Sequence, residues 1–527
     1  MKKVKKLLSL IVAAVMVIAM AVPTFADAGK TTITITDATN GSTYVAYKIL
    51  NATNNGENYA YTMNATYKDV LISTLNTLNT PNTPNLSADA ADKDIIGRIS
   101  GLTDTRTFAD SLYRAIKAKT PDAAVTAAND KAVFNVDQGY YLIAQTVKGN
   151  SEDTFSLVML YTAGKTNIDI KSKKDKPELT KKVMETNDST GYVSGWQDGA
   201  DYDIGDLVPF QLTGTLPSDY ASYSQYKYVF HDKMSAGLTY NSIESVKVVD
   251  ASGKELATIT DDFTVIKPTT HNTDKCNLEF ACANLKTISA ANQIDSTCKI
   301  VVTYKAELNK NAVIGSAGNP NTAYLEYSNN PYSEGTPTTS ETPEDAVIVF
   351  TYQITANKVD KNGQALNGAG FTLFKYDKKT EDYVAVGTEI KGTEENPIHK
   401  FEFKNADAGQ YKLVETTVPE GYNKADDIEF KVVAIYDTDS VDPKLTSLKV
   451  TDLTGKELTS FTVGKNGNDG SYTFTGDVST NIVNQSGSLL PSTGGMGTKI
   501  LYTVGVILVL GAGIVLVTRK RVSDAAK

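Results

Sequence analysis

The chain has 527 residues, and 61 acidic against 52 basic side chains give it a formal net charge of −9. This balance argues against a nucleic-acid-binding protein, which needs a basic surface. With 28 tyrosines, 37 glycines and 21% charged residues, the composition favours short strands separated by turns, so we expect an all-β chain of several domains. Its three cysteines are too few for a disulfide framework over this length.

The first 28 residues have the pattern of an export signal. A lysine-rich start precedes an apolar run from Leu7 to Val22, and Ala26-Asp27-Ala28 offers small residues for signal peptidase. We therefore assign residues 1–28 to a signal peptide that does not belong to the fold, and we expect a secreted protein.

Residues 29–170 are expected to form a β-rich N-terminal domain with helical insertions. Alternation over residues 31–36, a turn at Asn40-Gly41 and a second run over residues 43–47 indicate a β-hairpin. The other elements expected here are helical patches at 67–79 and 104–118 and strands at 133–147 and 155–161.

A basic run follows, Lys171-Ser172-Lys173-Lys174-Asp175-Lys176-Pro177. Repelling like charges and a proline fit a solvated interdomain linker over residues 171–177. The run comes directly after Ile168-x-Ile170, at the end of the first domain.

A middle domain is expected over residues 178–345, ending in a linker at 336–345 that is rich in Thr, Pro and Glu. Lys181 alternates with apolar residues in the opening strand, so its side chain points into the core. A buried ammonium is costly, which favours the neutral, nucleophilic amine. Asp232 and Asn329 also face inward by the same period-two rule.

The third domain, residues 346–487, repeats this arrangement. Lys358, Glu415 and Asn484 each share a strand face with apolar or aromatic neighbours. A buried carboxylic acid with a raised pKa can accept a proton from a neighbouring group and return one. The plain alternative is a Lys–Glu ion pair beside an asparagine in a turn.

The first domain is expected to lack this chemistry. Residues 139–146 align without gaps on residues 409–416, and the alignment puts Gln145 in the place of Glu415. A glutamine cannot shuttle a proton, and the opening strand has no lysine between Thr31 and Thr39.

The last segment, residues 488–527, contains Leu490, Pro491, Ser492, Thr493 and Gly494, then an uncharged run over 500–517 and the basic Arg519-Lys520-Arg521. Eighteen residues without a charge are just long enough to cross a bilayer as a helix, and the basic cluster stays in the cytoplasm. This order resembles the cell-wall sorting signal of Gram-positive surface proteins, which sortase cuts between Thr493 and Gly494. A permanent membrane anchor is the plain alternative.

The lysine run is similar in position to the pilin motif of sortase-assembled pilins. In that family a lysine attacks the acyl-enzyme made from another subunit's LPxTG. The register implies Lys173 as the nucleophile, but the motif's Tyr-Pro is missing, so Lys171, Lys174 and Lys176 stay open.

The two later domains also resemble known pilin domains. Segments 201–210, 231–238 and 327–329 resemble the middle domain of isopeptide-forming fimbrial shaft proteins, and segments 358–360 and 411–422 resemble the collagen-adhesin B-type domain, an immunoglobulin-like sandwich. The resemblance implies a Lys181–Asn329 bond assisted by Asp232, and a Lys358–Asn484 bond assisted by Glu415.

We therefore expect tandem immunoglobulin-like β-sandwiches forming the shaft subunit of a cell-surface fimbrium. The expected partners are sortase, other copies of the chain and peptidoglycan; a host surface ligand is left open. The alternatives are a monomeric wall-anchored adhesin that binds host protein or glycan, and a pilus base or tip subunit.

No enzyme, cofactor or metal site is expected. His231, His271 and His399 are scattered without a metal-binding motif. The acidic run Asp198, Asp201, Asp203 and Asp206 lacks the terminal glutamate of an EF-hand and fits a strand edge better than a calcium site. Cys298 is expected either to pair with Cys276 or Cys282 or to remain a buried thiol.

Overall fold

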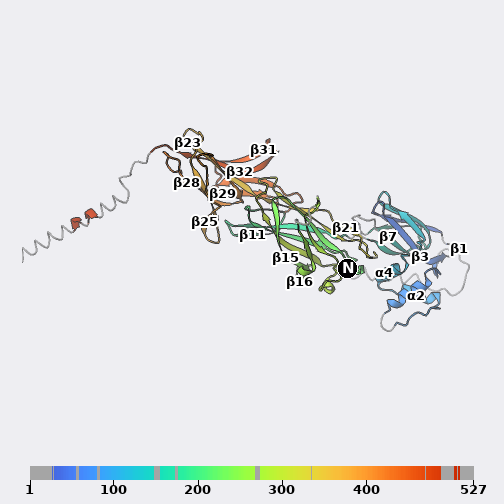
Figure 1. Ribbon diagram of the computed structural model, residues 1–527. Helices are drawn as coiled ribbons and strands as arrows, with labels where there is room; N and C mark the ends of the chain where they lie inside the picture. The colour runs from blue at the N-terminus through green and yellow to red at the C-terminus, as the bar shows by residue number, and fades with distance from the viewer. Residues whose placement is uncertain are drawn as a thin grey trace, which may run out of the picture.

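The computed structural model describes residues 26–27, 29–54, 59–79, 83–146, 155–172, 176–267, 273, 275–333, 335–468, 471–487, 504–506 and 508–510. These residues form three β-rich units in a row, which confirms the all-β prediction (Figure 1). Lys173, Lys174, His271, the segment 490–494 and the signal peptide up to residue 25 lie outside the described residues. Within the described ranges, no helix has the length and apolar character needed to span a bilayer.

The first unit contains two sheets. In the smaller one, β2 (Lys30–Thr36) lies between β6 (Lys131–Asp137) and β9 (Asn167–Lys171). In the larger one, β3 (Thr43–Asn54) pairs with β7 (Gly139–Thr146). The other strands of the larger sheet are β1 (Ala26–Asp27), β4 (Tyr59–Met63), β5 (Ala123–Thr126) and β8 (Leu157–Tyr161).

The hairpin predicted at Asn40-Gly41 is wrong. Gly41 does turn the chain with a φ of 81°. However, β2 and β3 join different sheets, because Ile33 and Tyr44 face one shared core from its two sides. The turn therefore carries the chain across a sandwich rather than back along one sheet.

Three helices pack on the larger sheet's side of this unit. The two expected ones are α2 (Lys68–Thr77) and α4 (Thr105–Ile116), and Asp104 caps α4 by accepting from the backbone N–H groups of Arg106 and Thr107. The sequence analysis missed α3 (Asp92–Ser100), because this helix is only 9 residues long and buries only Ile95 and Ile99, too few positions to show a helical period.

The middle unit is a sandwich of a 6-stranded and a 7-stranded sheet. The first has the order β11 (Tyr192–Gln197), β10 (Leu179–Asn187), β13 (Leu207–Thr215), β19 (Lys299–Leu308), β15 (Leu238–Val249) and β16 (Glu255–Thr258). The second has the order β12 (Gly199–Asp201), β22 (Asp345–Phe350), β20 (Asn319–Ser328), β14 (Tyr228–Met234), β18 (Leu278–Cys282) and β17 (Thr264–Ile266), with β21 (Thr339–Glu341) on β20. Short 3₁₀ turns are η1 (Tyr220–Ser222), η2 (Thr260–Asp262) and η3 (Ala291–Gln293).

The segment expected to be a linker, residues 336–345, is largely built into this sandwich. β21 pairs with β20, and the Thr342 hydroxyl accepts a hydrogen bond from the Leu325 N–H at 3.0 Å. Thr and Ser side chains form hydrogen bonds with backbone groups here, so the segment is not a solvated linker. Sheet pairing continues through Phe350, so only Thr351, itself buried, separates the middle sandwich from the next strand.

The third unit has one sheet in the order β27 (Lys400–Ala406), β23 (Tyr352–Asp360), β32 (Ser471–Asn484) and β31 (Phe461–Asn468). The facing sheet is β25 (Asp382–Ala385), β24 (Gly370–Asp377), β28 (Gly409–Thr417), β29 (Ile428–Tyr436) and β30 (Leu445–Thr451), with β26 (Ile390–Lys391) on β24. The first and last strands, β23 and β32, run parallel, and Lys358 lies opposite Ile482.

Candidate functional sites: two buried lysine clusters

In the third unit the structure brings together the three predicted residues. Lys358 is on β23, Asn484 is at the end of β32 and Glu415 comes from β28 in the facing sheet, and all three are buried. Glu415 Oε1 accepts from Asn484 Nδ2 at 2.8 Å and lies 3.8 Å from Lys358 Nζ. One carboxyl oxygen therefore reaches both the amine and the amide nitrogen.

Electrostatics favour reactivity of this lysine. Burial lowers the pKa of Lys358 to about 8 and outweighs the opposing effect of Glu415. Asn484 Oδ1 is buried and has no hydrogen-bond partner among the described residues, so its carbonyl is not held by a competing donor. Lys358 Nζ meanwhile donates to the Ile482 carbonyl at 2.9 Å, which orients the amine beside β32.

In the middle unit Lys181 on β10 and Asp232 on β14 form a fully buried ion pair. Burial lowers the pKa of the Lys181 amine and raises the pKa of the Asp232 carboxyl, and the attraction between the pair opposes both shifts. Lys181 Nζ also donates to the Tyr304 hydroxyl at 3.0 Å, and that hydroxyl donates to Asp232 Oδ2 at 2.7 Å.

The asparagine at this second cluster is Asn321, not the predicted Asn329. Asn321 Nδ2 donates to the Tyr304 hydroxyl at 2.8 Å, and Asn321 Oδ1 is buried with no hydrogen-bond partner in the described structure. Both asparagines face inward from β20 or its end, but eight residues of strand separate them by about 26 Å. The pairing of β20 with β14 sets Asn321 opposite Met234, two residues beyond Asp232.

Asn329 instead helps to join the first two units. Its side chain donates to the Ser340 hydroxyl at 2.8 Å and accepts from the Thr338 hydroxyl at 2.6 Å. Its backbone carbonyl accepts from the Phe155 N–H of the first unit at 3.0 Å. Nearby Tyr332 packs edge-on against the Phe155 ring, with ring centroids 4.6 Å apart.

The first unit has no matching cluster in its described part. Gln145 is buried on β7 opposite Tyr44, and its Nε2 has no hydrogen-bond partner among the described residues. The inward positions of β2 are Thr31, Ile33 and Ile35. The glutamine thus occupies the position of the acid without a lysine on the opening strand.

The sequence analysis missed a third charged cluster, between the middle and last units. Lys375 on β24 lies 2.9 Å from Asp407, 2.8 Å from Asp203 and 3.3 Å from Asp188. Burial opposes its charge, but the carboxylates of Asp407 and Asp203 outweigh burial and raise the pKa of Lys375. Spacing along the chain gives no signal for this site, because it joins residues from two domains.

The acidic run of the middle unit also contributes to this interface. Asp198 Oδ2 accepts from the Ser440 N–H at 2.8 Å, Asp201 Oδ2 from the Ala408 N–H at 3.0 Å and Asp203 Oδ1 from the Asp407 N–H at 2.9 Å. These carboxylates therefore accept hydrogen bonds from backbone N–H groups of the last unit. Neither interpretation of this run from the sequence, a strand edge or a calcium site, had predicted that role.

We expect Lys375→Met to destabilise the pair of units by about 3–5 kcal/mol, because it leaves buried carboxylates without their ammonium. Chemical unfolding monitored by the fluorescence of the single tryptophan, Trp196, would measure this. Lys378→Met is the matched control, since that lysine is half exposed and its ion pair, with Glu381 at 2.9 Å, lies at the surface. Equal stabilities of the two variants would contradict the assigned role of Lys375.

Three parts of the chain match known protein families. Residues 204–331 match the profile of the Gram-positive pilin backbone subunit 2, Cna-B-like domain; residues 352–447 match a prealbumin-like fold domain; and residues 482–524 match the LPXTG cell wall anchor motif. The trypsin-resistant surface T6 protein of Streptococcus pyogenes serotype M6 is 28% identical over 478 residues, which cover 78% of this chain and 80% of the relative. The chain thus contains the backbone domain and the LPXTG cell wall anchor of Gram-positive pilins.

Two solved structures align along most of the pilin. The T6 backbone pilin of serotype M6 Streptococcus pyogenes has 20% identity and a TM-score of 0.49, over 88% of this chain and 100% of that one. The major pilin SpaD of Corynebacterium diphtheriae has 17% identity and a TM-score of 0.46, over 89% and 100%.

The family prediction is thereby confirmed, and with it the location. The pilin is a secreted protein anchored in the cell wall and displayed on the surface, and its relatives are structural subunits rather than enzymes. Its three cysteines, Cys276, Cys282 and Cys298, form no disulfide within the described residues, and all are buried.

Proposed function

We propose that this pilin is the repeating shaft subunit of a covalent pilus and that two internal Lys–Asn isopeptide bonds stabilise it. The observation that carries the bond assignment is the position of Glu415 Oε1, within reach of both Lys358 Nζ and Asn484 Nδ2. A simple ion pair needs no asparagine there, whereas amide formation needs the amine, the amide and the acid together.

The reaction in the third unit balances as follows. The neutral Lys358 amine attacks the Asn484 side-chain carbonyl carbon and forms a new C–N bond. The Glu415 carboxyl accepts a proton from the amine and delivers one to Nδ2, so the old C–N bond breaks and ammonia leaves. The event occurs once per molecule and is maturation, not turnover.

In the middle unit we assign the bond to Lys181 and Asn321, with Asp232 as the acid. Asp232 contacts the amine directly, but it reaches the amide nitrogen of Asn321 only through the Tyr304 hydroxyl. Tyr304 would relay the proton to the leaving nitrogen. This hydroxyl is an addition that the sequence analysis did not identify.

For assembly, sortase would cleave between Thr493 and Gly494, and the acyl group would pass to a lysine of the next copy or to peptidoglycan. Lys173 remains our candidate lysine. Of the alternatives that the structure describes, Lys171 ends β9 and forms an ion pair with Asp37 at 3.0 Å. A polymer of this kind would support adhesion and colonisation.

We expect Lys173→Ala to abolish high-mass polymers while monomer still reaches the wall, because only the nucleophile for chain growth is lost. Immunoblots of wall extracts would show this as loss of the ladder. Lys176→Ala is the matched control in the same run and should leave the ladder intact. A persistent ladder in the Lys173 variant would transfer the role to Lys171, Lys174 or Lys176, and a ladder that survives replacement of all four would contradict this mode of assembly.

A further inference from the structure

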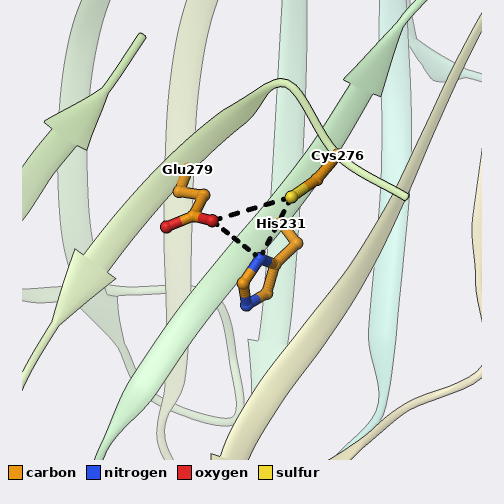
Figure 2. Close-up of side chains that lie close together, drawn as sticks. All are labelled: His231, Cys276 and Glu279. Atoms are coloured by element: carbon orange, nitrogen blue, oxygen red, sulfur yellow. Dashed lines mark hydrogen bonds and ion pairs between the residues drawn. The ribbon is translucent and has the colours of Figure 1, made fainter. Parts of the chain in front are cut away.

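Three metal-ligating side chains meet on the outer face of the middle unit (Figure 2). His231 is on β14, Glu279 lies directly opposite it on the neighbouring strand β18, and Cys276 lies two residues before β18 begins. Period two points this face away from the core side occupied by Asp232. The cluster is therefore separate from the Lys181 site, although adjacent residues of one strand contribute to both.

The distances among the three ligand atoms suit one small ion. His231 Nδ1 lies 3.6 Å from Cys276 Sγ and 3.3 Å from Glu279 Oε1, and those last two atoms are 3.6 Å apart. Zinc bond lengths of about 2.0–2.3 Å in a tetrahedron give ligand-to-ligand edges of about 3.3–3.6 Å. All three edges of this triangle fall in that range.

The second ring nitrogen of His231, Nε2, also has a partner, the carboxylate of Glu326. His231 Nε2 lies 3.0 Å from Glu326 Oε2 on β20, and Lys227 keeps Glu326 in place through a 2.6 Å ion pair. A carboxylate that accepts from Nε2–H leaves the Nδ1 lone pair directed at the triangle, as in carboxylate–histidine–zinc arrangements.

We propose that His231, Cys276 and Glu279 bind a divalent cation of the zinc class, with Glu326 orienting the histidine. A nitrogen, a sulfur and an oxygen ligand suit zinc better than calcium or magnesium, which prefer all-oxygen sites. The fourth position faces a partly exposed surface and would be taken by water, because the His231 and Glu279 side chains each remain 12% exposed.

Binding would exchange the Cys276 thiol proton for the metal and release that proton, since the thiolate is the ligand. The remaining neighbours are compatible with this. The Tyr324 ring stacks on His231 with centroids 4.6 Å apart, and the Thr273 hydroxyl lies 3.7 Å from Cys276 Sγ. The ion would clamp the residues just before β18 onto β14.

The test is titration of the metal-free wild-type chain with Co²⁺, used as a spectroscopic probe of the zinc site. One equivalent should produce a thiolate-to-cobalt charge-transfer band and the strong visible bands of a four-coordinate ion, and Zn²⁺ should displace both. Cys276→Ser should remove the charge-transfer band. Cys282→Ser is the matched control and should keep it, because that buried thiol lies on the core side.

A second pair of variants tests the orienting carboxylate. Glu326→Gln should weaken cobalt binding about 10–100-fold, while Glu341→Gln, which removes an exposed partner of Lys275, should leave it unchanged. Far-ultraviolet circular dichroism would check that each variant folds. Absence of the charge-transfer band in the folded wild-type chain, or its survival in Cys276→Ser, would overturn the proposal. His231, Cys276 and Glu279 would then be held together by hydrogen bonds without a metal ion.

Discussion

The Glu415→Ala variant should retain the ammonia that the third unit loses on maturation. Intact-mass spectrometry of the wild-type mature monomer should give a mass about 34 Da below that of its sequence, because each Lys–Asn condensation releases about 17 Da of ammonia. The variant should be only about 17 Da light, since Lys358 and Asn484 would be left without an acid to transfer the proton.

The same variant should lose stability as well as the cross-link. Closing the chain between residues 358 and 484 removes about 5 kcal/mol of unfolded-state entropy in the loop model, and that stabilisation would disappear. Trypsin digestion of the third unit should become fast, because its open form would be more populated.

Gln145→Ala is the matched control for Glu415→Ala. It removes a buried residue at the aligned position of the first unit, where no lysine is available, and should leave the mass deficit at about 34 Da. A wild-type monomer of full mass would contradict the bonds altogether and leave Lys358 and Glu415 as a buried ion pair.

The second large effect distinguishes Asn321, on β20, from Asn329, directly after that strand. Asn321→Ala should recover one ammonia mass and remove about 5 kcal/mol of loop-closure stabilisation from the middle unit. Asn329→Ala should leave the mass deficit intact, because its amide bonds Ser340 and Thr338 rather than the Lys181 cluster. The same mass measurement applies to both variants, and a deficit that responds to Asn329 instead would restore the original sequence prediction and refute the assignment to Asn321.

These two asparagines show where sequence reasoning stops. Period two placed Asn329, Lys181 and Asp232 inward, and the structure buries all three; it was not applied to Asn321, which has the same parity as Asn329 and is equally buried. It could not supply the register between β20 and β14, because a shift by an even number of residues keeps every side chain on the same face. Only the pairing of Asp232 with Ala323 decides that Asn321 lies beside the lysine.

In the third unit the prediction from sequence succeeded more fully. The inward residues of β23, β28 and β32 were assigned correctly, and Asn484 closes the last strand directly beside the lysine strand, which leaves little freedom of register. The clusters around Lys375 and His231 were not predictable in this way. Each cluster joins residues that are far apart in sequence, Lys375 with Asp203 in one and His231 with Glu279 in the other, and neither set has a spacing that a local motif would reveal.

The single residue between β22 and β23 has a mechanical consequence. Thr351 is fully buried, and its hydroxyl donates to the Ala406 carbonyl at 3.3 Å, so the joint offers no free torsion for one sandwich to swing against the other. Lys375 and the carboxylates of Asp198, Asp201 and Asp203 bridge the same joint. The middle and last sandwiches should therefore move as one rigid body about two domains long. A filament built from such subunits would have to bend at joints outside this rigid pair of sandwiches.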